Sequence, residues 1–246
     1  MTSVAGPVPS AYLLDVEGTT TPLTFVTDVL FPYARRHAET YLSGLDDGPL
    51  LDEIVAAFRD DHADEVRHGE DPPAWHDGDA ATRRASVRAH LEWLMDEDRK
   101  STALKMLQGR IWAAGYHDGS LVGEVHDDVP PALSRWSTRG VRVAIFSSGS
   151  VLAQKLLFAH TRHGDLTPFI EAHFDTTTGP KKEPGSYTTI SRALGTTPEQ
   201  TCFVSDVVAE LDAARAAGMH TALAVREGSA PPTSHPVVRS FATLPS

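Results

Sequence analysis

The segment AYLLDVEGTTTP, residues 11–22, decides how the rest of this sequence is interpreted. Residues Ala11–Val16 form a short, mainly apolar run that follows Pro9 and is too brief for a helix. Such a run between turn-forming residues is typical of a strand that is buried on both faces of a parallel sheet. We therefore expect a buried strand whose carboxyl end carries Asp15 and Glu17.

The same pattern recurs farther along the chain, each time after residues of helical character and a Gly or Pro break. These further runs are Val141–Phe146, Thr201–Ser205 and His220–Val225, and His173–Asp175 has the character of another strand end. Strands that alternate with helices favour a parallel sheet covered by helices on both faces. The expected fold class is α/β, with a doubly wound, Rossmann-like parallel sheet.

The region between the first two expected strands lacks such runs and shows helical periodicity instead. Four amphipathic helices are expected there, near Thr24–Leu42, Leu50–Val66, Ala80–Glu97 and Ser101–Ala114. The expected organisation is therefore an α/β core made of residues 1–22 and 126–246, with an all-helical domain, residues 23–125, inserted into it.

Length and composition restrict the classes of protein. The chain has 246 residues, which at roughly 150 residues per domain makes one large domain or two modest ones. Lysine and arginine minus aspartate and glutamate is 22 − 33 = −11, so nucleic acids and anionic membranes are not expected as partners.

Cysteine usage and the apolar segments point to the cell interior. Cys202 is the sole cysteine, which excludes an intramolecular disulfide and a multi-cysteine metal site. No window approaches the run of about 18 apolar residues that a membrane span needs. The start MTSVAGPVPS lacks the features of a signal peptide. We expect a soluble, cytoplasmic protein.

Polar side chains stand at the carboxyl ends of the expected strands, the edge at which doubly wound sheets bind ligands. They are Asp15, the segment Ser147–Ser150, Lys181 and Asp206. Each also has an ordinary interpretation. Asp15 would be a loop carboxylate, Ser148 or Ser150 a helix N-cap, Asp206 another helix N-cap, and Lys181 a solvated charge. Taken together, clustered carboxylates repel one another, so we expect a cation among them.

Such a cluster suits phosphoryl transfer to an aspartate. Asp15 would attack phosphorus and form an aspartyl-phosphate that water then hydrolyses. Mg²⁺ held by Asp15, Asp206 and the main-chain carbonyl of Glu17 would shield the charge of the phosphate. Ser147 and the amides that begin the next helix would hold phosphate oxygens, and Lys181 would add positive charge.

Glu17 is the candidate for proton transfer. It lies two residues after Asp15 and therefore on the same side of an extended chain, where it could protonate the leaving oxygen.

Several segments resemble known proteins. Asp15-Val16-Glu17-Gly18-Thr19, Ser147-Ser148-Gly149, Lys181 and Ser205-Asp206, in this order, resemble the motifs of the haloacid dehalogenase-like phosphohydrolases. The helical insertion is similar to their cap domain. Most members have Asp-x-Asp in the first motif, and here Glu17 takes the second place. LLDVEGTTTPLTFVTDVLFPYA, DRKSTALKMLQGRIWAAGY and IFSSGSVLAQKLLF resemble, more closely, the enolase-phosphatases of methionine salvage.

The closer resemblance implies a reaction and a set of site residues. The implied substrate is 2,3-diketo-5-methylthiopentyl 1-phosphate, a small phosphate ester that is enolised and then dephosphorylated to an acireductone. The implied protein is a monomer with one Mg²⁺. The resemblance assigns Asp15, Glu17 and Asp206 to the magnesium site, and Ser147, Ser148 and Lys181 to substrate binding. Asp15 and Glu17 are the catalytic candidates. For the enolisation that the resemblance implies, Glu17 is the nearest candidate for the base, because its extra methylene reaches farther than an aspartate would.

Some assignments have an alternative. Lys182 adjoins Lys181, and a slip of one residue would exchange their roles, although the Gly-x-Lys spacing favours Lys181. Glu210 lies four residues after Asp206, which suits either an acceptor for metal-bound water or a solvated helix face.

Aromatic and apolar residues after the first motif are candidates for contact with the methylthio tail. They are Phe25, Val26, Phe31 and Tyr33. Ordinary packing inside the helical domain is the alternative, and for Phe31 we favour it.

Two other functions stay open at this point. One is a phosphatase for another small phosphate ester, and the other is a phosphate-binding protein that has no turnover. The presence of Asp15, Lys181 and Asp206 together argues against the second.

Overall fold

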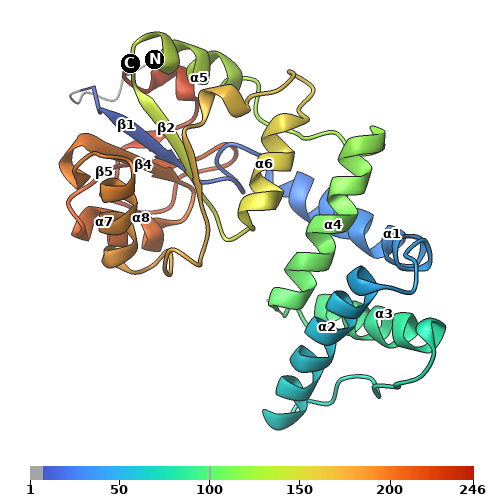
Figure 1. Cartoon of the computed structure of the whole chain (residues 1–246). Coiled ribbons are helices and arrows are strands. Elements are labelled where there is room, and N and C mark those ends of the chain that lie inside the picture. The colour runs from blue at the N-terminus through green and yellow to red at the C-terminus, as the bar shows by residue number, and fades with distance from the viewer. Residues whose placement is uncertain (1–7, 100) are drawn as a thin grey trace. The chain divides into compact units, whose positions relative to one another are not determined.

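The computed structural model describes residues 8–99 and 101–246. Contacts divide the chain into two compact units, one of residues up to Val26 together with Leu121–Ser246, and one of Thr27–Ser120. The first unit contains a sheet and helices, and the second contains helices (Figure 1). Among the described residues, no helix is long and apolar enough to span a membrane.

The first unit is built on one sheet, with the strand order β3-β2-β1-β4-β5-β6 among the residues described. The strands are β1 Ala11–Leu14, β2 Arg142–Phe146, β3 Ala172–Phe174, β4 Thr201–Ser205, β5 His220–Ala224 and β6 Val237–Val238. Every neighbouring pair is parallel. The expected α/β class with a doubly wound parallel sheet is therefore confirmed.

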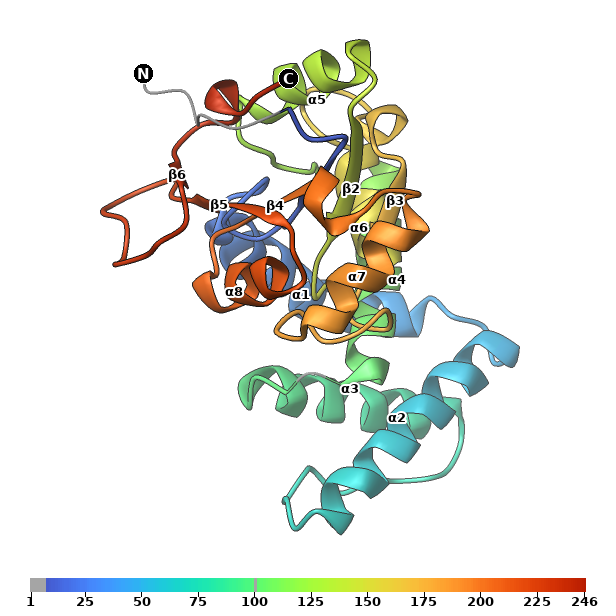
Figure 2. The ribbon, with the colours of Figure 1, turned by 90° about the vertical axis from the view of Figure 1, so that its left-hand side faces the viewer.

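Helices cover both faces of this sheet. They are α5 Val129–Thr138, α6 Val151–Ala159, α7 Pro184–Ala193 and α8 Val208–Ala216, with single 3-10 turns at Thr167–Phe169, Pro198–Gln200 and Phe241–Thr243. Helices α7 and α8 lie on one face, and α5 and α6 on the other (Figure 2). A ligand can therefore approach the sheet only along its edges.

Successive side chains of β1 point to opposite faces of the sheet, so the hydrophobic core lies on both faces. Leu13 is fully buried in a cluster with Phe203 and Tyr187, on the side of α7 and α8. Its neighbour Tyr12 points to the opposite face and stacks on Trp136 of α5, with 4.1 Å between the ring centroids. Because apolar side chains leave both faces of β1, the strand is an almost continuous apolar run in the sequence.

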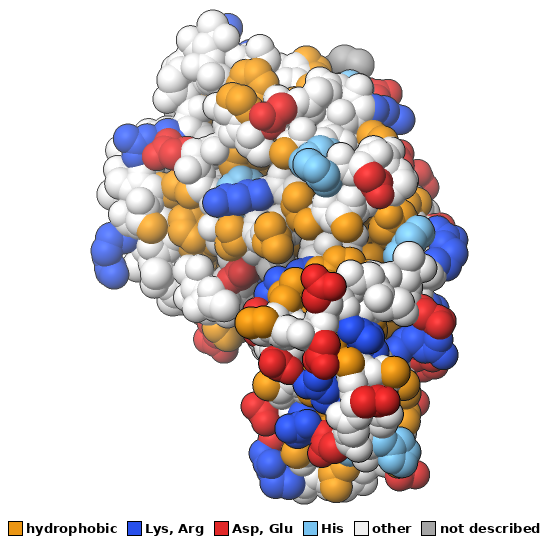
Figure 3. Space-filling model, turned by 45° about the vertical axis from the view of Figure 1, so that its right-hand side comes forward, with side chains coloured by type: hydrophobic (Ala, Val, Ile, Leu, Met, Phe, Trp, Pro, Cys, Tyr) orange, Lys and Arg blue, Asp and Glu red, His pale blue; other side chains and the backbone are white. Residues whose placement is uncertain are grey.

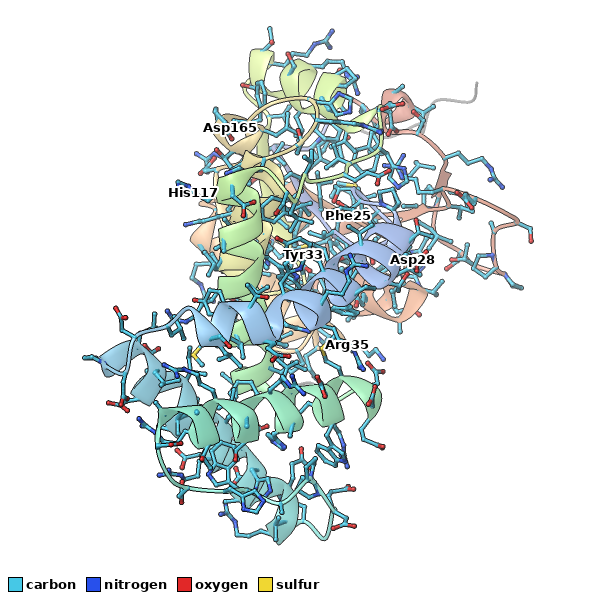
Figure 4. All side chains as sticks on the ribbon, turned by 90° about the vertical axis from the view of Figure 1, so that its right-hand side faces the viewer. Phe25, Asp28, Tyr33, Arg35, His117 and Asp165 are labelled. Carbon is cyan, nitrogen blue, oxygen red and sulfur yellow. The ribbon has the colours of Figure 1, made fainter. Side chains whose placement is uncertain are left out.

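The second unit consists of the expected helices. They are α1 Phe31–Ser43, α2 Pro49–Arg67, α3 Ala80–Asp96 and α4 Thr102–Asp118, and a π-helical segment Phe25–Leu30 precedes α1. Tyr33 and Arg35 both extend from α1 (Figure 4). The Tyr33 hydroxyl lies 2.7 Å from Ser120 Oγ, and the Arg35 guanidinium pairs with Asp96 at 2.6 Å.

The expected core position of Phe31 is wrong. Its side chain is 39% exposed and stacks on Trp112, with 6.5 Å between ring centroids. Phe25, Val26 and Tyr33 are buried. The π-helical segment shifts the angular positions of the residues that follow it, so an ideal helical repeat misplaces Phe31.

The first strand is shorter than expected, because it ends at Leu14 and not at Val16. The carbonyl of Val16 accepts hydrogen bonds from the amides of Thr19, Thr20 and Thr21, which closes a tight turn. Glu17 therefore lies in a turn. The expectation that Glu17 shares one side of an extended chain with Asp15 is wrong.

The sequence predicts helical character before the later strands but no bounds for α5 and α7, and it does not predict β6. Helix α5 begins with consecutive prolines after Val129, and α7 contains Gly185 and β-branched threonines, which are weak helix formers. Strand β6 has only two residues. These elements depend on packing against the sheet more than on local preference.

Candidate active site

Strand register brings the candidate residues to one edge of the sheet. Leu14 of β1 lies opposite Ile145 of β2 and Val204 of β4. The Asp15 amide donates to the Val204 carbonyl at 2.9 Å, so Asp15 is held where β1 ends. Ser147 follows β2 and Asp206 follows β4 by one residue each, and both therefore leave the sheet at the same edge as Asp15.

Lys181 lies directly on Asp15. Its ammonium nitrogen is 2.7 Å from Asp15 Oδ1 and 2.7 Å from Glu210 Oε2, and the side chain is only 9% exposed. The same nitrogen lies 5.8 Å from the centroid of the Phe146 ring. The solvated interpretation of Lys181 is wrong. Lys182, the alternative by a one-residue slip, is exposed.

The loop before α7 is anchored on both sides of Lys181. The Tyr187 hydroxyl donates to the Lys181 carbonyl at 2.6 Å, and the Ser186 hydroxyl donates to the Pro180 carbonyl at 2.8 Å. Both donors come from buried positions of α7. The backbone of Lys181 is thus fixed by the core, and this places its ammonium group.

Ser205 contacts the carboxylates of both Asp15 and Glu210. The sequence motif includes Ser205, but no role was predicted for it. Its hydroxyl oxygen lies 2.9 Å from Asp15 Oδ2 and 3.2 Å from Glu210 Oε2, and it accepts the Val207 amide at 3.1 Å. Its position as the last residue of a buried strand, next to Asp206, is the signal that could have identified it. Glu210 is buried, so its solvated interpretation is wrong.

Negative charge exceeds positive charge in this cluster. Among the described residues, the carboxylates of Asp15, Asp206 and Glu210 share the ammonium of Lys181. Burial by itself lowers the pKa of Lys181, but its two carboxylate partners outweigh burial and raise the pKa above its ordinary value. Burial and the negative charge of Asp15 raise the pKa of Glu210, which Lys181 only partly offsets.

Asp206 carries the uncompensated charge. Its side chain reaches solvent, yet partial desolvation by neighbouring atoms and the negative charge of Asp15 raise its pKa to about 6. The N-cap of α8 is Val207, so the interpretation of Asp206 as a helix cap is wrong. Ser150, by contrast, does cap α6 through a 3.3 Å hydrogen bond from the Ala153 amide.

Gly18 gives the turn after Asp15 its close approach to Asp206. Its φ is +67°, and a Cβ added there would lie 2.2 Å from Asp206 Oδ2. Only glycine adopts this conformation without strain while leaving room for the carboxylate. The turn that contains Glu17 is therefore pressed against Asp206.

Replacing Gly18 by Ala is expected to lower turnover by about tenfold to a hundredfold, or about 1.4–2.7 kcal/mol of barrier. The added methyl group must displace the Asp206 carboxylate or open the turn. The measurement is phosphate release at saturating substrate across a Mg²⁺ titration.

Gly140→Ala is the matched control, because Gly140 has φ +71° and open space around its Cβ position. It introduces the same backbone strain without a clash and should retain near wild-type turnover. Equal losses in both variants would show that backbone strain, and not the approach to Asp206, causes the effect.

Several polar groups of the segment after β2 form hydrogen bonds within that segment. Ser147 is buried, and its Oγ accepts the Gly149 amide at 3.1 Å. The Val151 amide donates to Asp175 Oδ2 at 3.2 Å, and the Ala153 amide donates to Ser150. The expectation that the amides beginning this helix hold a phosphate is therefore wrong for these groups. The Ser147 hydroxyl still has its own hydrogen to donate.

Arg226, which follows β5, forms a hydrogen bond to the turn after Asp15. Its Nε donates to the Thr19 carbonyl at 2.8 Å, and its Nη1 pairs with Asp128 at 2.7 Å. The Asp128 carboxylate also accepts the Phe241 amide. The turn is thus tied to the start of α5 and to the C-terminal segment.

The oxygen atoms at this edge fit a magnesium ion. Mg²⁺ prefers hard oxygen ligands and is commonly held by one or two carboxylates together with substrate phosphate and water. Asp15 and Asp206 supply carboxylates with unbalanced negative charge, and the Glu17 carbonyl lies in the turn between them. Among the residues described, no group of three His, Cys, Asp or Glu side chains is placed to hold a metal, and this ligand set does not need one.

Comparisons with known proteins agree with this geometry. Residues 9–218 match the family profile of haloacid dehalogenase-like hydrolases. A relative from Sorangium cellulosum named enolase-phosphatase E1 is 51% identical over 220 residues, which cover 89% of each chain. A relative of the same name from Pseudomonas aeruginosa is 45% identical over 95% of this chain and 97% of its own.

A solved structure is also similar over nearly the whole chain. The UTR4 protein of Saccharomyces cerevisiae matches with a TM-score of 0.77 and 34% sequence identity, over 96% of this chain and 100% of that one. These similarities extend across both the sheet-containing unit and the helical unit. The chain belongs to the enolase-phosphatase E1 family of the haloacid dehalogenase-like hydrolases.

Proposed function

We propose that this chain is a Mg²⁺-dependent enolase-phosphatase. It would convert 2,3-diketo-5-methylthiopentyl 1-phosphate into the acireductone 1,2-dihydroxy-3-keto-5-methylthiopentene and phosphate. Relatives named enolase-phosphatase E1, one of them 51% identical and another 45% identical, support this assignment. One observation supports the phosphatase step above all. The Asp15 carboxylate, at the end of β1, forms an ion pair with the buried side chain of Lys181.

Asp15 is the proposed nucleophile. One of its carboxylate oxygens attacks phosphorus, so that an acyl-phosphate bond forms while the bond between phosphorus and the enol oxygen breaks. Water then hydrolyses the acyl phosphate and restores the carboxylate. Contacts from the Val16 amide, Ser205 and Lys181 support this role, because they hold the carboxylate in one orientation.

Lys181 and the serines are proposed to bind the phosphate. The Lys181 ammonium, whose pKa lies above its ordinary value, stays charged at neutral pH and neutralises a phosphate oxygen. Ser147 donates its hydroxyl hydrogen to a second oxygen, and Ser148 lies next to it in the same loop. Lys182 is not proposed to contact the phosphate.

Glu17 is proposed to transfer protons. It would protonate the leaving enol oxygen, and it is the nearest candidate for the base that enolises the diketone. Its position in the turn between Asp15 and Gly18 supports this role. Mg²⁺ held by Asp15, Asp206 and the Glu17 carbonyl would supply positive charge at the phosphate and polarise the diketone.

The helical unit is proposed to be the cap domain. It spans Thr27–Ser120, which begins four residues after and ends five residues before the expected boundaries of 23 and 125. The remainder would form the hydrolase core, to which every residue of the proposed chemistry belongs.

A time course tests the proposal. The purified protein is incubated with the diketo phosphate and Mg²⁺ while enediol absorbance and released phosphate are followed together, with a chelator as control. Both signals should appear, and the chelator should abolish phosphate release. Release from other phosphate esters alone would replace the substrate assignment, and no release from any ester would leave only a binding function.

A further inference from the structure

We infer that Gln154, acting with His173, positions the segment Ser147–Gly149 for phosphate binding. Gln154 lies on α6, outside the groups to which the proposed reaction assigns chemistry. The inference deepens the proposed function and rests on it where it assigns phosphate to this segment. The hydrogen bonds themselves do not depend on that assignment.

The Gln154 amide uses both of its hydrogens on backbone carbonyls. Its Nε2 donates to the Gly149 carbonyl at 2.9 Å and to the Phe174 carbonyl at 2.8 Å, and the residue is 2% exposed. Because both neighbours of Nε2 can only accept, the orientation of the amide is determined by chemistry. A buried polar side chain in the apolar helix VLAQKLLFA is therefore fully used as a donor.

His173 completes the arrangement from β3. Its Nδ1 lies 3.2 Å from Gln154 Oε1, and since this oxygen only accepts, Nδ1 must carry the hydrogen. Burial and nearby Lys155 lower the pKa of His173 to about 4, which keeps the ring neutral at physiological pH. The same ring lines a surface hollow of about 470 Å³ with Leu152 and Ile170. Hydrophobic side chains gather around lysine and histidine side chains on this face (Figure 3).

These contacts close a loop of hydrogen bonds around the segment. The Phe174 carbonyl accepts the Ser147 amide at 3.2 Å as well as the Gln154 amide. At the other end of the segment, the Gly149 carbonyl is held by Gln154 while the Gly149 amide donates to Ser147 Oγ. Gln154 is thus the side chain that connects the Gly149 end of the segment to β3, whereas the Ser147 end is bonded to β3 through its own amide.

Loss of Gln154 has a defined consequence. The carbonyls of Gly149 and Phe174 would each lose a buried donor, which is costly, and the segment would gain conformations in which it does not face a phosphate. The expected effect is therefore on phosphate affinity and on KM for the ester more than on the chemical step.

The test compares amide hydrogen exchange and inorganic phosphate affinity in full-length variants. In Gln154→Leu, exchange at Gly149 should accelerate by at least about tenfold. The dissociation constant of inorganic phosphate in the presence of Mg²⁺ should rise by at least about tenfold. Amides of β1 should keep their wild-type exchange.

Substitutions at His173 provide a second route if Gln154→Leu does not fold. His173→Leu removes the donor to Gln154 and should change both readouts in the same direction, whereas His173→Asn keeps a donor near the Nδ1 position and should restore them. Gln200→Leu is the matched control, since it makes the same change at an exposed amide that precedes β4 at the opposite end of the strand.

The outcomes separate the inference from the proposed function. Unchanged exchange and unchanged phosphate affinity in folded Gln154→Leu, or in His173→Leu, would overturn the positioning role. Absence of phosphate release by the wild-type protein would instead overturn the proposed function, and exchange at Gly149 would still decide whether Gln154 holds the segment.

Discussion

Replacing Asp15 by Asn is expected to lower phosphate release by at least about a thousandfold, or about 4 kcal/mol of barrier. The amide keeps the shape of the carboxylate and can still accept the Val16 amide, but it cannot form the acyl phosphate. It also removes the negative charge that faces Lys181 at 2.7 Å. Single-turnover phosphate release with the diketo phosphate measures the loss, and thermal unfolding checks that the variant is folded.

Asp165→Asn is the matched control for this substitution. Asp165 lies in an exposed loop of the same unit (Figure 4), where its carboxylate accepts the Thr167 amide and hydroxyl. The same chemical change there should leave phosphate release at the wild-type rate. If Asp15→Asn kept a tenth of the activity, Asp15 would not be the nucleophile.

Replacing Lys181 by Met is expected to lower kcat/KM by at least about a hundredfold, or about 2.7 kcal/mol. The variant leaves Asp15 and Glu210 close together without the cation that both contact, and it takes away a positive charge from the phosphate. Removing one partner of a buried charge cluster also destabilises the fold, so the unfolding temperature should decrease. Steady-state kinetics and thermal unfolding measure the two effects separately.

Lys182→Met makes the same change one residue away, on an exposed side chain. It should leave both the kinetics and the unfolding temperature near wild type. The reverse result, with activity lost in Lys182→Met and kept in Lys181→Met, would mean that Lys182 contacts the phosphate.

The local sequence pattern was sufficient to predict the strands and helices that carry the site residues. Strands β1, β2 and β4 are buried on both faces, and each is therefore a short apolar run with a polar residue at its end. The helices of Thr27–Ser120 have an apolar stripe at helical spacing, so α2, α3 and α4 were predicted within four residues of their observed bounds. Helix α1 begins at Phe31, seven residues after its expected start, because Phe25–Leu30 is π-helical. The bounds of α5 and α7, which have weak local preference, and the two-residue strand β6 could not be predicted in this way.

The local sequence pattern did not predict which residues contact the site residues. Lys181 and Lys182 are adjacent and chemically identical. The Gly-x-Lys spacing favours Lys181, and hydrogen bonds from Tyr187 and Ser186 hold the backbone that places its ammonium against Asp15. Gln154 is one polar residue in an apolar helix, and its two acceptors come from other segments of the chain.

The sequence by itself determined the fold class, the helical insertion and the order in which Asp15, Ser147, Lys181 and Asp206 meet the sheet edge. These properties follow from periodicity and from the polar residues that end buried strands, which are local in the chain. The tertiary structure decided the turn at Gly18, the pairing of Lys181 with Asp15 and Glu210, and the exposure of Phe31. Each of these depends on contacts between distant segments or on a change of helical geometry, and neither leaves a periodic signal in the sequence.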